Sequence, residues 1–301
     1  MKKIGFIIFL LLMLLFFLLF PSEALQASRN GLILWFEQLL PTLLPFSVLS
    51  YLVLQSGIFI RHKKRLAKKI SGCEWYVILC GFLFGFPIGS KLTADLYEHR
   101  QISKTNATLL CCFTNNLSPV YVTAAIQEML SLPGTWELYL LIYGIPFLTG
   151  IFLLLRYGRP AGIQKNTASG FHMNMQIVDT GILKGFETLI KICGYIMLFS
   201  IVAGMLQLLP AENAFAKVFL IGCAEVTNGI SALSAYSCSA ELKYLLAVLF
   251  LSLNGLSGLF QTASILSSTD LSMKNYIKLK GLLVLITTVS AGLLFLRGRL
   301  L

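Results

Sequence analysis

A polar pattern that could bind a small ligand occurs twice in the chain, 139 residues apart. Asn115-Asn116-Leu117-Ser118 recurs as Asn254-Gly255-Leu256-Ser257, and a Thr-Ala-x-Ile sequence follows each copy five residues later. Asn and Ser side chains donate and accept hydrogen bonds, which suits a flat molecule with polar ring atoms. Both copies lie inside strongly apolar segments, where polar groups are unfavourable. Their repetition predicts a duplicated transporter core, with two half-sites facing one substrate near the bilayer midplane.

Two other apolar stretches, 74–96 and 213–241, are interrupted near the middle by residues that disfavour a helix. The interruptions are Gly85–Gly89 and Thr227–Ser231. We expect each stretch to form a re-entrant hairpin whose tip exposes backbone N–H groups at a half-helix start, where carboxylates or polar ring atoms bind well. The candidate substrate-binding residues are Gly85, Pro87, Gly89, Ser90, Lys91, Asn115, Asn116, Ser118, Glu225, Thr227, Asn228, Gly229, Asn254 and Ser257.

Ionisable residues near the tips have more than one interpretation. Lys91 either selects an anion or extends from the hairpin to the membrane surface. Glu225 could carry a coupling proton, orient the second tip or bind a substrate donor. For the whole candidate group, the structural alternative is that the residues satisfy freed backbone groups or let helices pack closely.

A second acidic pair, Glu37 and Glu187, lies at equivalent positions in the two halves. Lys184 and Lys191 share a helical face with Glu187, because they precede and follow it by three and four residues. This spacing favours an internal ion pair or an interfacial anchor over a coupling-ion role.

Composition identifies the class of protein. A mean hydropathy of +0.79, with 56% apolar and 12% charged residues, excludes an ordinary soluble domain. We expect an all-α polytopic membrane protein with spans at 31–58, 107–130, 137–155, 181–209, 244–268 and 279–297. Residues 4–20 form a further apolar stretch, either a membrane anchor, which is favoured, or a cleaved signal peptide. Both interpretations leave residue 30 on the non-cytoplasmic side.

The distribution of basic residues predicts the topology. With the N-terminus cytoplasmic and both hairpins re-entrant, the inside segments 1–3, 59–73, 97–106, 156–180 and 269–280 hold 16 Lys and Arg residues, against five outside. The last of these segments includes Lys280. The basic run Arg61–Lys69 is expected to be a lipid-facing loop. The resulting topology has seven crossings and two hairpins.

The two halves are expected to be inverted repeats, since an odd number of crossings separates them. Each would contain a re-entrant hairpin and a broken transmembrane helix. Matching residues support this register: Gly31, Phe36, Glu37, Leu39 and Ser50 correspond to Gly181, Phe186, Glu187, Leu189 and Ser200. The predicted units are an N-terminal anchor or signal-like segment at 1–27, repeat 1 at 28–160, a cytoplasmic linker at 161–180 and repeat 2 at 181–301.

No catalytic or metal-binding group emerges from the sequence. The seven cysteines show no CxxC spacing, and the three histidines lie in expected loops. We therefore expect no enzyme activity, no metal and no cofactor, while a coupling proton or sodium ion stays open. The expected partners are a small-molecule substrate and the lipid bilayer, not nucleic acid, and homo-oligomerisation stays open.

Several motifs together resemble the YlbJ/SpoVV family of sporulation membrane proteins. They are Gly85-Phe86-Pro87-Ile88-Gly89-Ser90-Lys91, Phe113-Thr114-Asn115-Asn116-Leu117-Ser118-Pro119, Glu225-Val226-Thr227-Asn228-Gly229, Ser28-Arg29-Asn30-Gly31-Leu32 and the pair Pro41 and Pro45. The resemblance implies the nucleoside-recognition gate architecture shared with concentrative nucleoside transporters. It also implies export of dipicolinic acid from the mother cell during endospore formation, with a location in the outer forespore membrane. Nucleoside or nucleobase transport and a non-transporting role in spore maturation remain the alternatives.

Overall fold

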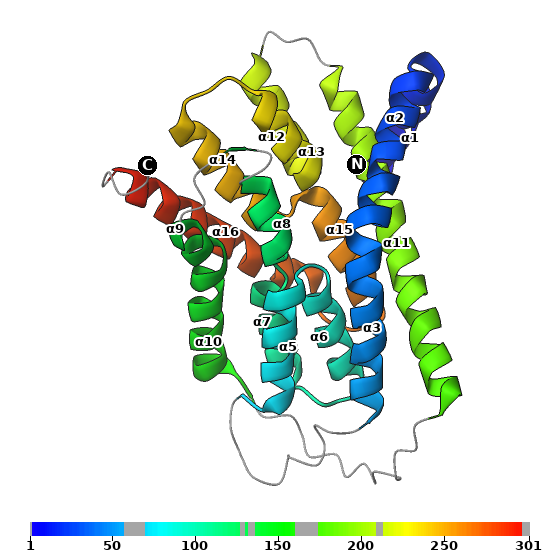
Figure 1. Ribbon diagram of the computed structural model, residues 1–301, viewed down its shortest axis with the longest axis vertical. Coiled ribbons are helices and arrows are strands. Elements are labelled where there is room, and N and C mark those ends of the chain that lie inside the picture. Colours follow the sequence, from blue (N-terminus) through cyan, green and yellow to red (C-terminus); the bar gives the residue numbers. More distant parts are fainter. Residues whose placement is uncertain are drawn as a thin grey trace.

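The computed structural model describes residues 2–56, 70–126, 130–131, 136–159, 174–208 and 213–296. The described residues form helices and their connections, with no strand among them, so the predicted all-α fold is confirmed (Figure 1). The predicted basic loop Arg61–Lys69 lies outside these residues. Most of the predicted linker 161–180 also lies outside them, and α11 (Met175–Gln207) begins within its described part.

The first two helices, α1 (Lys2–Leu19) and α2 (Pro21–Leu34), meet at a bend of 111°. Proline suits the first position of a helix, where its missing N–H is not needed. The helix continues through the π-helical turn η1 (Trp35–Leu39) into α3 (Leu40–Gln55). The helix that contains the predicted span 31–58 therefore begins at Pro21, ten residues before the predicted start.

Helix α11 runs beside α2 and α3 in the opposite direction (Figure 1). Glycines allow close approach at both ends of the contact: Gly31 lies against Ser200, and Gly181 lies against Tyr51. The Nε1 of Trp35 donates to the carbonyl of Leu189 at 2.9 Å. Residues that the sequence places at matching positions in the two halves thus lie in one interface.

Two helical hairpins form from the two interrupted stretches. They are α5 (Gly72–Phe84) with α6 (Ile88–Glu98), and α12 (Ala214–Ala224) with α13 (Val226–Ala235). Their open ends lie toward opposite ends of the molecule (Figure 1). The first break falls at Gly85–Pro87, as predicted, but the second prediction is wrong: the chain breaks at Glu225, and Thr227–Ser231 is helical. The reason is that the Glu225 carboxylate accepts the N–H of Asn228 at 2.8 Å and caps α13.

Each copy of the repeated pattern interrupts a helix. Asn115–Ser118 separates α7 (Lys104–Thr114) from α8 (Pro119–Ala124). Asn254 alone separates α14 (Ala240–Leu253) from α15 (Gly255–Leu266), and it takes the left-handed conformation with φ of 63°. Asn tolerates this conformation better than most residues do. Each half therefore contains a helical hairpin followed by a broken helix.

Only some of the predicted crossings are single long helices. Within the described residues, four helices are long and apolar enough to cross a membrane, and the bent pair α1–α2 would make a fifth span. The four are 136–157, 175–207, 240–266 and 273–294. The first comprises α9 (Trp136–Tyr139), η4 (Leu140–Gly144) and α10 (Ile145–Tyr157). The last lies in α16 (Met273–Leu296). The predicted spans 31–58 and 107–130 are built from shorter pieces.

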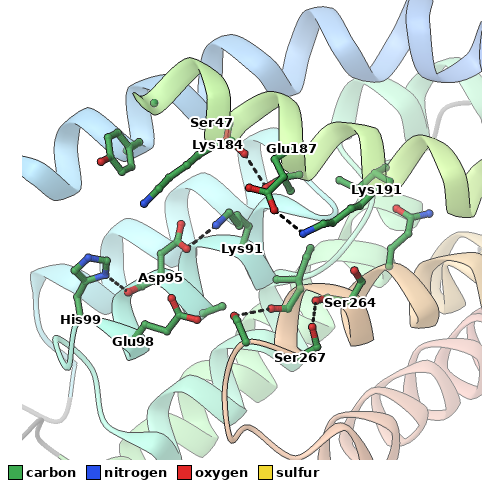
Figure 2. A pocket seen from close by; sticks show the side chains of 18 of the residues that line it. Ser47, Lys91, Asp95, Glu98, His99, Lys184, Glu187, Lys191, Ser264 and Ser267 are labelled. Atoms are coloured by element: carbon green, nitrogen blue, oxygen red, sulfur yellow. Dashed lines mark hydrogen bonds and ion pairs between the residues drawn. The ribbon is translucent and has the colours of Figure 1, made fainter. Parts of the chain in front are cut away.

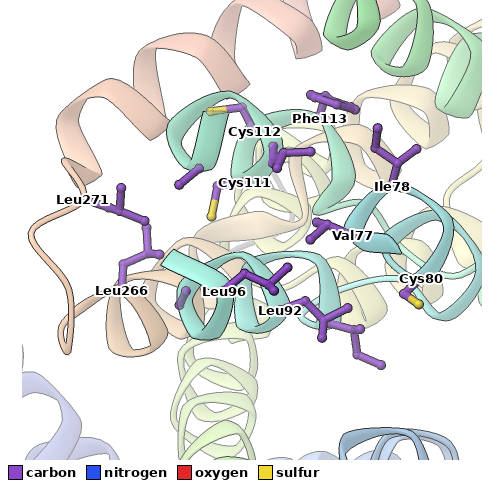
Figure 3. Packing of buried hydrophobic residues seen from close by; sticks show 14 of the residues in the cluster. Val77, Ile78, Cys80, Leu92, Leu96, Cys111, Cys112, Phe113, Leu266 and Leu271 are labelled. Carbon is purple, nitrogen blue, oxygen red and sulfur yellow. The ribbon is translucent and has the colours of Figure 1, made fainter. Parts of the chain in front are cut away.

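Buried apolar residues fix the first hairpin against α7. Figure 3 shows Val77 and Ile78 of α5 beside Leu92 and Leu96 of α6, with Phe113 of α7 in the same cluster. Each of these five side chains is at most 2% exposed. Leu266 and Leu271 extend the cluster to the end of α15 and the turn that follows. Because a closely packed interior is stiff, this cluster fixes the position of the first hairpin and of its tip.

We predict that Gly229→Ala lowers the unfolding temperature of the detergent-solubilised protein. A Cβ on Gly229 would overlap the Cα of Gly222, which faces it across the second hairpin. Overpacking of this kind costs about 1–3 kcal/mol. The matched control is Gly194→Ala, because a Cβ at Gly194 has no neighbour within 4 Å. Equal unfolding temperatures for the two variants would contradict the packing argument.

Candidate functional site

The two copies of the repeated pattern meet in the interior. The Asn254 Nδ2 donates to the carbonyl of Asn115 at 3.0 Å. In turn, the Asn115 Nδ2 donates to Thr262 Oγ1 of α15 and to Tyr276 Oη of α16, both at 3.0 Å. All four residues are buried. We call these four residues, with Asn116 and Lys280, the junction.

Three members of the junction, Thr262, Tyr276 and Lys280, are not among the predicted site residues, and the charged one is Lys280. Its Nζ donates to the carbonyl of Asn115 and to Asn116 Oδ1, both at 3.0 Å, and the residue is only 3% exposed. The prediction that it lies in a cytoplasmic segment with other basic residues is wrong. The sequence did hold a signal, because Lys280 belongs to one buried stripe at helical spacing. That stripe is Tyr276, Lys280, Leu283, Val284, Thr287 and Ala291.

The first hairpin tip rests on the break between α7 and α8. The N–H of Phe86 donates to the carbonyl of Asn116, and Gly85 lies so close to Ser118 that a Cβ would overlap the Ser118 backbone. Gly85 has a φ of 78°, which a residue with a side chain rarely adopts. Ser118 itself caps α8 by accepting the N–H of Tyr121 at 3.2 Å. The tip and the break therefore satisfy each other's polar groups.

The second tip contacts the other break. Gly255 packs against Ala224 and Glu225, at the turn from α12 into α13. The buried Glu225 carboxylate also accepts the Asn228 Nδ2 at 2.9 Å, and the same amide nitrogen lies 3.2 Å from Ser200 Oγ of α11. Thr227 accepts a longer bond, 3.3 Å, from Tyr121 Oη of α8. The second tip is thus connected to α8 of the first half and to α11.

Five further predicted site residues contact other residues of the protein. They are Pro87, Gly89, Ser90, Gly229 and Ser257. Ser90 donates to the carbonyl of Pro87 at 2.8 Å, and Ser257 accepts from Gln261 Nε2 at 2.9 Å. Gly89 lies against the backbone of Thr114, and Gly229 lies against Gly222. These contacts match the structural interpretation of the candidate group.

A cleft of about 280 Å³ lies between α3, α6, α11 and α15, and no junction residue is among its described lining residues. Three lysines line it: Lys91 of α6, and Lys184 and Lys191 of α11 (Figure 2). Lys91 pairs with Asp95 at 2.7 Å, and Lys191 pairs with Glu187 at 2.8 Å. The predicted ion pair of Glu187 on α11 is present, but both of its side chains are exposed rather than internal. Lys91, the predicted anion-selecting residue, already has a carboxylate partner.

The remaining lysine of the cleft has an aromatic partner. The Nζ of Lys184 lies 4.9 Å from the centroid of the Tyr51 ring, a distance typical of a cation–π contact. Tyr195 also lines the cleft, as does Gln261, whose amide bonds to Ser257. The cleft therefore combines exposed charge and aromatic rings, and it extends to the helix that follows the second break.

An exposed cluster of polar and charged residues connects α6 and α7 to the turn between α15 and α16. Asp270, in the turn between α15 and α16, accepts hydrogen bonds from Lys104 Nζ and Tyr97 Oη, both at 2.6 Å. The bonds from these two groups lower the pKa of Asp270 below its usual value. No group of three His, Cys, Asp or Glu residues suited to a metal ion occurs in the described part of the chain.

Comparison with curated proteins finds the "Sporulation integral membrane protein YlbJ" of Bacillus subtilis (strain 168). It is 27% identical over 302 aligned positions, which cover 85% of this chain and 74% of the relative. The chain is similar in sequence to YlbJ. The resemblance to the YlbJ family is thereby confirmed, and the apolar helices together with the relative's name support an integral membrane protein. No protein-family profile matches the YlbJ-like chain, and no solved structure matches it.

Replacing Asn254 should separate its backbone role from its side-chain role. Asn254→Gly keeps the left-handed conformation and loses the bond to Asn115, at a cost of about 1 kcal/mol. Asn254→Leu loses the bond and adds about 1–2 kcal/mol of backbone strain. We expect unfolding temperatures in the order wild type, Asn254→Gly, Asn254→Leu, measured in detergent. Equal values for the two variants would show that backbone strain at this position is unimportant.

Proposed function

We propose that the protein is a membrane transporter of a small polar or anionic aromatic metabolite. The observation that carries the proposal is the contact between two helix breaks, at Asn115 and Asn254. A cleft lined by charged and aromatic residues extends to α15, the helix that follows the second break. Irregular backbone at membrane depth is tolerated where protein or a water-filled cavity satisfies its polar groups. Transporters use such breaks near the midplane to hold substrates.

The proposed topology is seven crossings with a cytoplasmic N-terminus, two re-entrant hairpins and inverted repeats. Three features support it. The open ends of the two hairpins lie toward opposite ends of the molecule (Figure 1). The α2–α3 helix and α11 are antiparallel, and their matching glycines contact each other's helix. The described ends of α3, α5, α10 and α11 that adjoin the predicted cytoplasmic segments lie together at the lower end of Figure 1.

Dipicolinic acid is the specific substrate that we propose, exported across the outer forespore membrane. The relative's name supports a membrane role in sporulation. In the cleft, Lys184 provides a cation that pairs with no described carboxylate, and Tyr51 and Tyr195 provide rings for a flat ligand. A volume of about 280 Å³ suits a molecule of this size better than a large one.

Nucleoside or nucleobase transport is the second candidate. The cleft also holds Asp95, Glu98 and Glu187, so its three lysines face an equal number of carboxylates. Carboxylates suit the hydroxyl groups of a ribose better than they suit a dianion. A non-transporting protein of spore maturation would use the same fold without moving a solute.

Transport in reconstituted vesicles separates these candidates. We expect purified protein to move dipicolinate. We also expect Lys184→Gln to raise the KM for dipicolinate severalfold, because this variant lacks the cleft lysine that pairs with no described carboxylate. The control is Lys278→Gln, which removes an exposed lysine of α16. Movement of nucleosides without dipicolinate would support the second candidate. Failure to move any of these solutes would overturn the transport function.

A double variant tests whether the junction belongs to the transport pathway. Asn115→Leu with Asn254→Gly removes both amide groups and keeps the backbone conformation at the second break. We expect it to abolish transport in protein that still unfolds cooperatively. Full transport by this folded variant would exclude the two asparagines from the substrate site.

A further inference from the structure

Lys280 is a buried ammonium group without an acidic partner among the described residues. Its Nζ contacts two oxygen atoms, the carbonyl of Asn115 and the Oδ1 of Asn116. The ion pairs among the described residues use Lys91, Lys104 and Lys191, and none includes Lys280. Burying a charge costs several kcal/mol unless it is paired or well hydrogen-bonded. A lysine within a membrane-length helix is therefore a functional candidate by default.

The polar atoms described around this ammonium group include several oxygen acceptors. Asn115 follows the last residue of α7, so its carbonyl lies at the negative end of that helix dipole. Two further oxygen atoms of the junction, Asn115 Oδ1 and Asn254 Oδ1, are buried and have no hydrogen-bond donor in the described part of the chain. The titratable side chains nearby are Cys112 of α7 and Tyr276 of α16, and neither is a carboxylate. Two oxygen acceptors of the junction thus lack a donor among the described residues.

An oxygen-rich helix break of this kind is where transporters bind a coupling cation. Unwound carbonyls and the carboxyl ends of half-helices are the usual ligands of such ions. Lys280 presents its ammonium to one carbonyl and one amide oxygen at such an end. We infer that the Lys280 ammonium is a tethered cation that occupies the place of a soluble monovalent ion at the junction. A role of the Lys280 charge in ion-coupled transport rests on the proposed transport function. The inference that the ammonium takes the place of an ion at the junction does not rest on it.

Thermal unfolding in detergent tests the inference without transport. Wild type, Lys280→Met and the matched control Lys278→Gln are compared in sodium, potassium and choline chloride at equal ionic strength. We expect wild type and the control to unfold at the same temperature in all three salts. Lys280→Met should unfold at a lower temperature in choline and recover by on the order of 2–4 °C in sodium or potassium, because an ion that binds only the folded state stabilises it.

Two results would overturn the inference. One is a Lys280→Met variant that responds to the three salts as the control does, since the vacated place would then bind no ion. The other is a wild-type protein that sodium or potassium stabilises as much as the variant. Lys280→Gln replaces the methionine variant if that one does not fold. If neither folds, the wild-type response decides: salt-specific stabilisation overturns the inference, and its absence supports it. Failed vesicle transport would leave this result unaffected.

Discussion

The structure depends on satisfying backbone groups where helices break inside apolar surroundings. A broken helix leaves N–H and C=O groups without partners, and no water is available in a bilayer core. Here each hairpin tip packs on the break of its own half: Gly85 against Ser118, and Gly255 against Glu225. The amide of Asn254 then joins the two breaks by donating to Asn115. The polar residues of the repeated pattern thus provide the hydrogen bonds and close contacts that connect the tips and the breaks.

The features that the sequence predicted are those encoded by local residue type. Gly85 and Pro87 do not continue a helix, so the first tip was predictable, although the break ends at Pro87, two residues before the predicted Gly89. The duplicated Asn-x-Leu-Ser pattern predicted two equivalent breaks, and both breaks lie where it placed them. Glu187 and Lys191 stand four residues apart on one helix, and their ion pair follows from that spacing.

The features that the sequence did not reveal depend on tertiary contacts. Thr227–Ser231 has the composition of a break, yet it forms the first turns of α13 because Glu225 caps them. Lys280 stands near Lys274 and Lys278, so local charge assigned it to a loop. Only its place on the buried stripe of α16 separates it from its exposed neighbours, and only the fold shows which carbonyl it meets. The cleft likewise needs four helices from both halves, and no local pattern describes it.

Apart from the extensive interface of α11 with α2 and α3, the polar connection between the halves at the junction is sparse. Within each half, the tip and the break are held by close backbone packing, which does not deform gradually. Between the halves, the described polar contacts at the junction are a few single hydrogen bonds from the side chains of Asn115, Asn254 and Lys280. A net hydrogen bond is worth only about 0.5–1.5 kcal/mol. Rearrangement at the junction would therefore break few bonds, provided that the ammonium of Lys280 keeps oxygen partners in both arrangements.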